Sequence, residues 1–140
     1  MNNDLEKQRE GGCLCGAVRY TVAWPPQMIG TCQCANCQKQ SGSAVSVVAI
    51  VPYDSIQISG DLTDYEDSGE SGQALSRRFC AKCGSPVLSE SSGMQSAGIR
   101  ILKAGTLDDR SGISPSVHFW TSSGQDWFVL PEHGHKMERQ

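Results

Sequence analysis

Seven cysteines in a chain of 140 residues are the side chains whose type and spacing could do chemistry. They form three groups, with the sequences C-L-C, C-Q-C-A-N-C and C-A-K-C-G: Cys13 and Cys15; Cys32, Cys34 and Cys37; and Cys80 and Cys83. One or two residues between cysteines let two thiolates reach the same metal ion at about 2.3 Å. Each group is therefore a chelating unit. The last group is typical of a zinc knuckle, because the glycine after it, Gly84, permits a tight turn.

Seven ligands divide most naturally into four and three. Structural zinc uses four protein ligands, whereas catalytic zinc uses three and keeps one position for water or substrate. Pairing the two groups of two predicts a closed, structural site, made of Cys13, Cys15, Cys80 and Cys83. The remaining three come from one local segment and predict an open, catalytic site, made of Cys32, Cys34 and Cys37. We therefore expect two zinc ions per chain.

Other interpretations of the cysteines exist. A free cysteine is often a small buried hydrophobe, and a lone C-x-x-C can be a redox pair. The odd number of cysteines excludes complete pairing as disulfides within one chain. The polar, charged residues 1–10 contain no secretory signal, which favours a reducing, cytoplasmic compartment and hence metal binding.

Charge and hydropathy disfavour two classes of partner. The net charge is -3, and the basic residues are scattered rather than clustered, so there is no electrostatic reason to bind nucleic acid or an anionic membrane. No apolar run approaches the roughly 18 to 20 residues that cross a bilayer. We expect small-molecule partners instead.

The histidines, aspartates and aromatic residues are weaker candidates for a site. His118, in S-V-H-F-W, could point into a site, but a hydrogen-bonded structural role is favoured. Three further sets are expected to be tail residues in solvent, turn residues and core residues, respectively: His133 and His135; Asp108 and Asp109; Trp120, Trp127 and Phe128.

Short apolar segments separated by Gly, Pro, Ser and Asp predict the strands that must position these groups. They lie at residues 18–22, 44–51, 56–58, 75–79, 86–88, 99–102 and 117–120. No segment has a convincing helical stripe, so the predicted fold class is mainly β, made of antiparallel sheets with a zinc-ribbon-like cysteine knuckle and little helix. Serine- and glycine-rich stretches predict loops at residues 67–73 and 89–96.

The domain organisation is simple. The length suits one domain, which we place at residues 11–130. Residues 1–10 are expected to form a polar N-terminal arm, and residues 131–140 a polar C-terminal tail.

Several segments together resemble a known family. They are G-G-C-L-C-G-A-V-R-Y at 11–20, C-Q-C-A-N-C-Q-K-Q-S-G-S-A at 32–44, R-R-F-C-A-K-C-G-S-P at 77–86, A-G-T-L-D-D at 104–109 and V-H-F-W at 117–120. In order and spacing they are similar to the glutathione-dependent formaldehyde-activating enzyme family, which also includes centromere protein V. The resemblance covers about residues 11–128.

The resemblance implies a β-tent fold, one zinc ion held by four cysteines and a second held by three. The implied ligand sets agree with the division already reached. The implied activity joins formaldehyde and glutathione to S-hydroxymethylglutathione, and the enzyme is a carbon-sulfur lyase when the reaction is written in reverse. Three basic residues could pair with a glutathione carboxylate, although ordinary surface charge is favoured for each: Lys39, Arg77 and Arg78.

The leading hypothesis is an enzyme whose open zinc holds a thiol such as glutathione, or polarises the carbonyl of formaldehyde or another small aldehyde. A zinc ion held by three thiolates carries a formal charge of about -1, which favours thiol delivery. The alternative is a non-enzymatic module, in which both zinc ions are structural and the surface binds a protein. Nucleic-acid binding through a zinc ribbon is disfavoured by the acidic balance.

Overall fold

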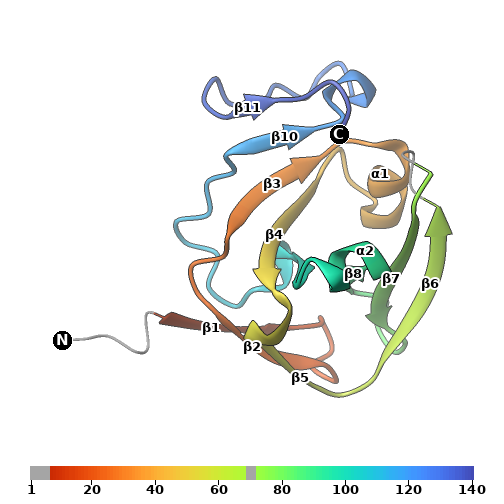
Figure 1. Cartoon of the computed structure of the whole chain (residues 1–140), viewed down its shortest axis with the longest axis vertical. Helices are drawn as coiled ribbons and strands as arrows, with labels where there is room; N and C mark the ends of the chain where they lie inside the picture. Colours follow the sequence, from red (N-terminus) through yellow and green to blue (C-terminus); the bar gives the residue numbers. More distant parts are fainter. Residues whose placement is uncertain (1–6, 69–71) are drawn as a thin grey trace.

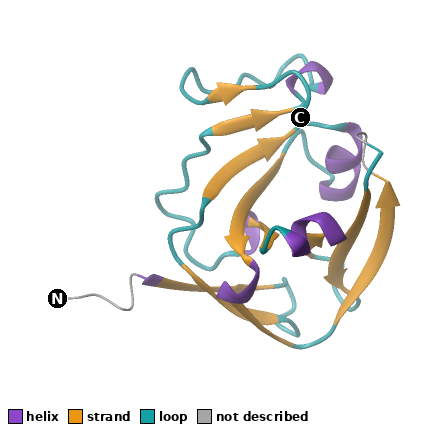
Figure 2. Cartoon of the chain, viewed as in Figure 1, coloured by secondary structure: helices purple, strands orange, loops and turns teal. Residues whose placement is uncertain are grey.

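The computed structural model describes residues 7–68 and 72–140. Within them the chain is mainly β, as predicted, and forms two sheets and two short α-helices (Figure 2). The smaller sheet has the order β1-β2-β5, with bounds Gln8–Gly12, Arg19–Ala23 and Ile56–Ser59. The larger has the order β11-β10-β3-β4-β9-β8-β7-β6, with bounds His135–Lys136, Val117–Phe119, Met28–Cys32, Ser46–Pro52, Ile99–Lys103, Pro86–Glu90, Ala74–Cys80 and Leu62–Ser68.

The two helices lie between the two ends of the larger sheet. They are α1, Ala35–Ser41, and α2, Ser92–Ser96, and Figure 1 shows both between the β3–β4 and β6–β7 pairs of strands. Within the described residues, three single-turn 3-10 helices have defined bounds: η2, Tyr53–Ser55; η3, Ala104–Thr106; and η4, Thr121–Ser123. No helix in the described part of the chain is long and apolar enough to span a membrane.

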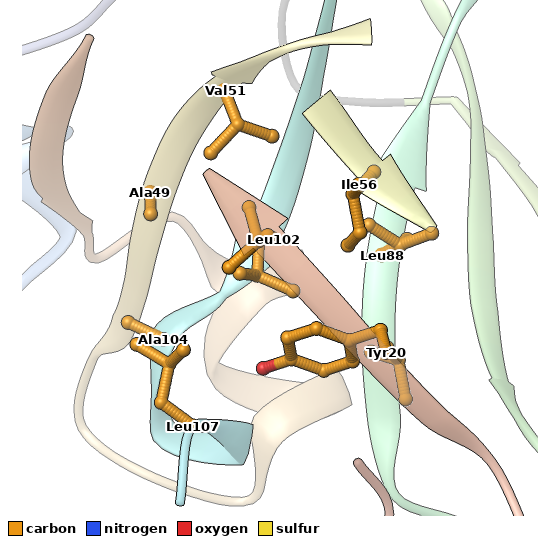
Figure 3. Close-up of a cluster of buried hydrophobic side chains, with 10 residues drawn as sticks. Tyr20, Ala49, Val51, Ile56, Leu88, Leu102, Ala104 and Leu107 are labelled. Atoms are coloured by element: carbon orange, nitrogen blue, oxygen red, sulfur yellow. The ribbon is translucent and has the colours of Figure 1, made fainter. Parts of the chain in front are cut away.

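The hydrophobic core joins the smaller sheet to the larger one. Tyr20 of β2 and Ile56 of β5 pack with Leu88 of β8 and Leu102 of β9, and all four are almost fully buried (Figure 3). The Tyr20 hydroxyl lies 2.7 Å from the Thr106 hydroxyl, so its polar atom has a partner. This core fixes the position of β4, β8 and β9, the strands that carry one wall of the site described below.

Alternation along β4 explains how one strand serves two purposes. Ala49 and Val51 point into the core, whereas Val48 and Ile50 line a pocket on the opposite face. Successive strand residues point to opposite faces, so an apolar run such as S-V-V-A-I-V-P can bury both. The larger sheet is thus apolar on two faces at this point.

The seven predicted strands all overlap observed ones, and four strands were not predicted. The four are β1, β3, β6 and β11. β6, with the sequence L-T-D-Y-E-D-S, is an edge strand whose side chains are mostly exposed, so burial never selected an apolar pattern there. The predicted loop at 67–73 is wrong at Asp67 and Ser68, which end β6, and residues 69–71 lie outside the described residues. The predicted loop at 89–96 is wrong too, because it contains the end of β8 and the whole of α2.

One edge of the larger sheet departs from the predicted antiparallel pattern. β10 pairs in parallel with both β3 and β11. Gly30 of β3 favours the pairing with β10, because a Cβ there would lie only 3.1 Å from the Phe119 ring and from the Val117 carbonyl oxygen. The parallel pairing brings Phe119 directly opposite Cys32.

Both polar termini extend further into the sheets than expected. The predicted N-terminal arm, residues 1–10, is wrong at its end, because β1 begins at Gln8. The predicted C-terminal tail, residues 131–140, contains β11, and the amide of Met137 donates to the His118 carbonyl at 2.8 Å. A single domain at 11–130 stays a prediction.

Candidate metal centres

Four cysteines from distant parts of the chain meet beside the smaller sheet. The Sγ atoms of Cys13, Cys15, Cys80 and Cys83 all lie within 4.8 Å of one another. Sulfur atoms bound to one tetrahedral zinc ion at 2.3 Å lie about 3.8 Å apart. The Cys13–Cys15 and Cys15–Cys80 separations are 3.6 and 3.8 Å. The described residues therefore place this four-cysteine cluster at the spacing that a closed tetrahedral ion requires.

Glycine turns shape both halves of the four-cysteine cluster. Gly16 and Gly84 follow their cysteine pairs with φ of 83° and 81°, a region that other residues rarely adopt. The Gly84 amide donates to the Cys80 carbonyl at 2.8 Å, and this closes the knuckle as the sequence predicts. Backbone amides also donate to sulfur: Val18 to Cys13 at 3.2 Å and Lys82 to Cys80 at 3.3 Å. Such bonds favour thiolates, the form that binds a metal ion.

The other three cysteines meet at the junction of β3 and α1. Cys32 ends β3, Cys34 caps α1 by accepting from the amide of Cys37 at 3.3 Å, and Cys37 lies within α1. Their Sγ atoms also lie within 4.8 Å of one another. In this three-cysteine cluster Cys34 and Cys37 are buried, and Cys32 is partly buried.

The side chain of Gln38 holds this junction in place. Its amide nitrogen donates to the Gln33 carbonyl at 2.7 Å and to the Ser123 carbonyl at 2.9 Å. These bonds tie α1 to the turn before it and to η4. The C-Q-C-A-N-C-Q segment therefore supplies both the thiols and one of the groups that position them.

Two buried cations lie beside the three-cysteine cluster. Arg77 of β7 is 3% exposed; its Nε donates to Asp67 Oδ2 at 2.7 Å, and its Nη1 lies 3.9 Å from the Sγ of Cys37. Lys103 of β9 is 7% exposed, and its Nζ lies 2.9 Å from the hydroxyl of Ser46. Sequence reasoning favoured surface charge for Arg77 and missed Lys103. A cation in an otherwise apolar strand, I-L-K-A, was the available signal for Lys103.

The cations and the thiols perturb each other. Hydrogen bonds from the thiols of Cys32 and Cys34, together with the charges of Lys103 and Arg77, outweigh burial and lower the pKa of the Cys37 thiol. Burial lowers the pKa of Lys103, although the charge on Cys37 opposes this. For Arg77, the bond to Asp67 and the charge on Cys37 outweigh burial and raise the pKa. Negative charge is therefore favoured on the Cys37 sulfur, whereas hydrogen bonds with the other thiols and burial raise the pKa of Cys32, and the pKa of Cys34 is raised as well.

A pocket of about 160 Å³, here called the cysteine pocket, opens beside this cluster. All three cysteines line it, together with Arg77 and Lys103. A ligand in the pocket can thus reach a metal ion held by the three thiols. One hydroxyl facing the same cavity, that of Ser89, is buried and has no hydrogen-bond partner among the described residues.

Trp120 forms part of the pocket wall in an unusual backbone conformation. Its φ of 58° and ψ of 42° are left-handed, a state that costs a non-glycine residue roughly 1 kcal/mol or more. Its amide donates to the Arg139 carbonyl at 3.1 Å. Of the aromatic residues predicted to close the core, Trp120 lines the pocket instead, and Trp127 is 70% exposed. That prediction is wrong for both.

The remaining candidates lie apart from both clusters. His118 is fully buried with its Nδ1 2.7 Å from the Thr31 hydroxyl, and the favoured structural role agrees with this bond. Asp108 forms an ion pair with Arg19, and Asp109 accepts from the Ser111 amide at 3.0 Å in a turn. Three of the other positions are exposed: His133 and His135 in the tail, and Lys39 on α1. Arg78 forms ion pairs with Asp64 and Glu90.

The donor chemistry of both clusters suits zinc. Thiolate is a preferred zinc ligand, four thiols make a closed site, and three beside a pocket leave room for another ligand. The buried cations offset part of the negative charge that three thiolates would otherwise place in a cavity with apolar walls.

Comparison with known proteins gives three findings. A model of the glutathione-dependent formaldehyde-activating enzyme family matches residues 8–123. A crystal structure of a Rhodobacter sphaeroides protein superposes with a TM-score of 0.56 at 19% sequence identity, covering 76% of this chain and 91% of the other. That likeness shows a shared fold. A comparison with curated proteins found no match.

Proposed function

Since this chain belongs to the glutathione-dependent formaldehyde-activating enzyme family, we propose that it joins glutathione to formaldehyde or another small aldehyde, and cleaves the adduct, as a zinc-dependent carbon-sulfur lyase. The proposed ligands of a catalytic zinc ion are Cys32, Cys34 and Cys37. Those of a structural zinc ion are Cys13, Cys15, Cys80 and Cys83. The proposed compartment is the cytoplasm, where thiols stay reduced.

One observation carries the proposal: all three cysteines of the three-cysteine cluster line a pocket that has room for a ligand beside a bound ion. A purely structural ion would need no cavity beside it. Two buried cations, Arg77 and Lys103, also line the pocket, and a thiolate is an anion. These features favour an enzyme over a module with two structural ions.

The proposed reaction forms one carbon-sulfur bond. A bound zinc ion would supply the positive charge that lowers the pKa of the incoming thiol. The sulfur electron pair attacks the carbonyl carbon, and the π electrons of the carbonyl move to its oxygen. That oxygen then takes one proton, which balances the proton that the thiol lost. Cleavage of the adduct is the reverse.

Lys103 is placed to assist at the carbonyl oxygen. Its ammonium group lines the pocket and has N–H donors beyond the one directed at Ser46. A donor aimed at the oxygen where negative charge develops stabilises the transition state. Arg77, already bonded to Asp67 and close to Cys37, serves instead to hold negative charge on the cluster.

Two serine variants test the division of roles. In the Cys34→Ser protein we expect the rate of adduct formation from glutathione and formaldehyde to fall to the uncatalysed rate, while bound zinc falls from two ions to one and the fold remains. In the Cys80→Ser protein we expect loss of the fold itself, because Cys80 is 1% exposed and joins strand β7 to the N-terminal hairpin.

The measurements are exchange rates by NMR, zinc content, and unfolding in denaturant. Equal loss of fold in the two variants would contradict the two roles. A zinc-loaded wild-type protein that neither binds glutathione nor accelerates the reaction would contradict the function.

A further inference from the structure

We propose that the apolar part of the cysteine pocket holds the side chain of an aldehyde larger than formaldehyde, an aryl or branched alkyl group of about six carbons. The inference rests on the proposed function and names its substrate class. It depends on the size of the pocket, on the residues of its walls and on the charges of glutathione.

The pocket is too large for formaldehyde alone. Its volume of about 160 Å³ is close to the roughly 150 Å³ of a cavity lined by Leu, Ile and Phe that binds benzene. Formaldehyde has two heavy atoms. The sulfur of the bound thiol and one formaldehyde molecule would leave part of this volume without a partner.

The pocket walls are apolar without serving the core. Val48 and Ile50 of β4, Ile101 of β9 and Met94 of α2 line it. None of these four belongs to the cluster of buried core residues. That cluster contains Ala49, the neighbour of Val48 and Ile50 on β4, and Leu102, the neighbour of Ile101 on β9. An apolar lining with a few polar groups at one end is typical of a site for an apolar ligand with a reactive head.

The charges of glutathione assign this space to the aldehyde. Glutathione carries two carboxylates and an ammonium group, and burying a charged group without a partner is strongly unfavourable. Of the two cations that line the pocket, Arg77 is already paired with Asp67, and Lys103 is the one that faces the carbonyl oxygen in the proposed reaction. A glutathione carboxylate inside the pocket would compete with that oxygen for Lys103, which favours keeping the charged parts of glutathione outside and leaves the apolar space to the substituent on the carbonyl carbon.

The chemistry is unchanged by the larger group. Sulfur adds to the carbonyl carbon, the carbonyl oxygen takes the proton, and the substituent stays attached to the carbon. No oxidant, reductant or further reactant is needed.

Two stable thioethers test the inference by binding rather than by activity. S-Benzylglutathione resembles the adduct of benzaldehyde without its hydroxyl, and S-methylglutathione resembles the adduct of formaldehyde. Burying one methylene contributes about a fourfold gain in affinity, so a buried ring should contribute well over tenfold. We expect S-benzylglutathione to bind the zinc-loaded protein at least tenfold more tightly by titration calorimetry.

Variants locate the ring. Ile101→Phe on β9 and Met94→Trp on α2 each add bulk to the pocket lining, and each should lower the ratio of benzyl to methyl affinity at least fivefold. The control Val129→Phe adds a ring at a position that is 83% exposed and should leave the ratio unchanged. Two variants are used so that a folding defect in one does not decide the result.

The possible outcomes separate this inference from the proposed function. If both compounds bind with equal affinity, the inference is overturned and the function stands. The inference is also overturned if the two pocket variants keep the wild-type ratio of affinities. A further contrary result is that the pocket variants weaken the binding of benzyl mercaptan but not that of S-benzylglutathione, which would assign the space to the thiol. Failure of both glutathione compounds to bind, with no catalysis from formaldehyde, overturns both proposals.

Discussion

At the scale of single residues, the site depends on buried charge as much as on cysteine. Arg77 is buried between the carboxylate of Asp67 and the thiol of Cys37. Asn36 of α1 also donates to Asp67, at 3.1 Å, so the network connects α1, β6 and β7. Cysteine spacing is visible in the sequence, because a chelating unit is local. The burial of Arg77 is not, because it depends on which strands come together.

Removal of Arg77 should destabilise the zinc-loaded protein. The Arg77→Met variant leaves Asp67, whose side chain is 15% exposed, with less compensation, and we expect a loss of about 3 kcal/mol in the free energy of unfolding. The measurement is urea denaturation. The double variant Asp67→Asn, Arg77→Met should recover part of the loss, because no uncompensated carboxylate remains. Additive effects of the two substitutions would contradict the ion pair.

Tyr20 gives the protein a pH dependence at high pH. Burial raises the pKa of its phenol to about 12, from the ordinary value of 10.0. Above pH 10 the unfolded chain ionises this group before the folded chain does, so unfolding is favoured as pH rises towards 12. At pH 11 the loss should be about 1 kcal/mol.

The comparison with Tyr20→Phe isolates this effect. The variant loses the bond to Thr106 at every pH but should show a smaller decrease in unfolding free energy from pH 8 to pH 11 than the wild-type protein. Denaturation at the two pH values gives the decrease for each protein. Equal decreases would show that Tyr20 does not titrate in this range.

At the scale of elements, burial decides which strands the sequence reveals. Strands β4, β8 and β9 carry apolar residues because at least one face is buried, and all three were predicted. β3 was missed because Gly30, Thr31 and Cys32 serve close packing, a hydrogen bond and a metal cluster rather than an apolar pattern. The parallel edge was missed because β10 reaches β3 from a distant part of the chain, and local pattern carries no information on pairing.

The knuckle glycine offers a prediction at this scale. Gly84→Ala introduces no contact within 4 Å, so its cost is the left-handed backbone alone, roughly 1 kcal/mol. Gly105→Ala is a matched control, because a Cβ there also meets nothing within 4 Å and its φ lies outside the positive range.

Thermal unfolding of the two variants measures the difference. We expect Gly84→Ala to lower the midpoint and to weaken zinc binding at the four-cysteine cluster, while Gly105→Ala leaves both near wild type. A control variant as unstable as Gly84→Ala would show that backbone conformation is not the cause.

At the scale of the whole molecule, the two cysteine clusters lie at two separate places in the fold. The four-cysteine cluster joins the N-terminal hairpin to β7, and the three-cysteine cluster lies beside the pocket between α1 and the larger sheet. Ligand number alone predicted this division. The pocket could not be predicted, because its walls come from β4, β9, α2 and the segment after β10.

Metal removal should therefore occur in two steps. A chelator of increasing strength is expected to take the first zinc ion from the three-cysteine cluster, because three ligands bind less tightly than four and the pocket gives access. Far-UV circular dichroism should change little. Loss of the second ion should coincide with unfolding. Release of both ions in a single step, together with unfolding, would contradict separate roles.

The position of Trp120 has a consequence for the order of events during synthesis on the ribosome. The four-cysteine cluster is complete once Cys83 has emerged, whereas the pocket wall needs Phe119 and Trp120. The ligands of the four-cysteine cluster are therefore available to a zinc ion before the residues of this pocket wall have been synthesised. A nascent chain would thus be able to bind zinc at the four-cysteine cluster early, and a ligand in the cysteine pocket only after Trp120 has been synthesised.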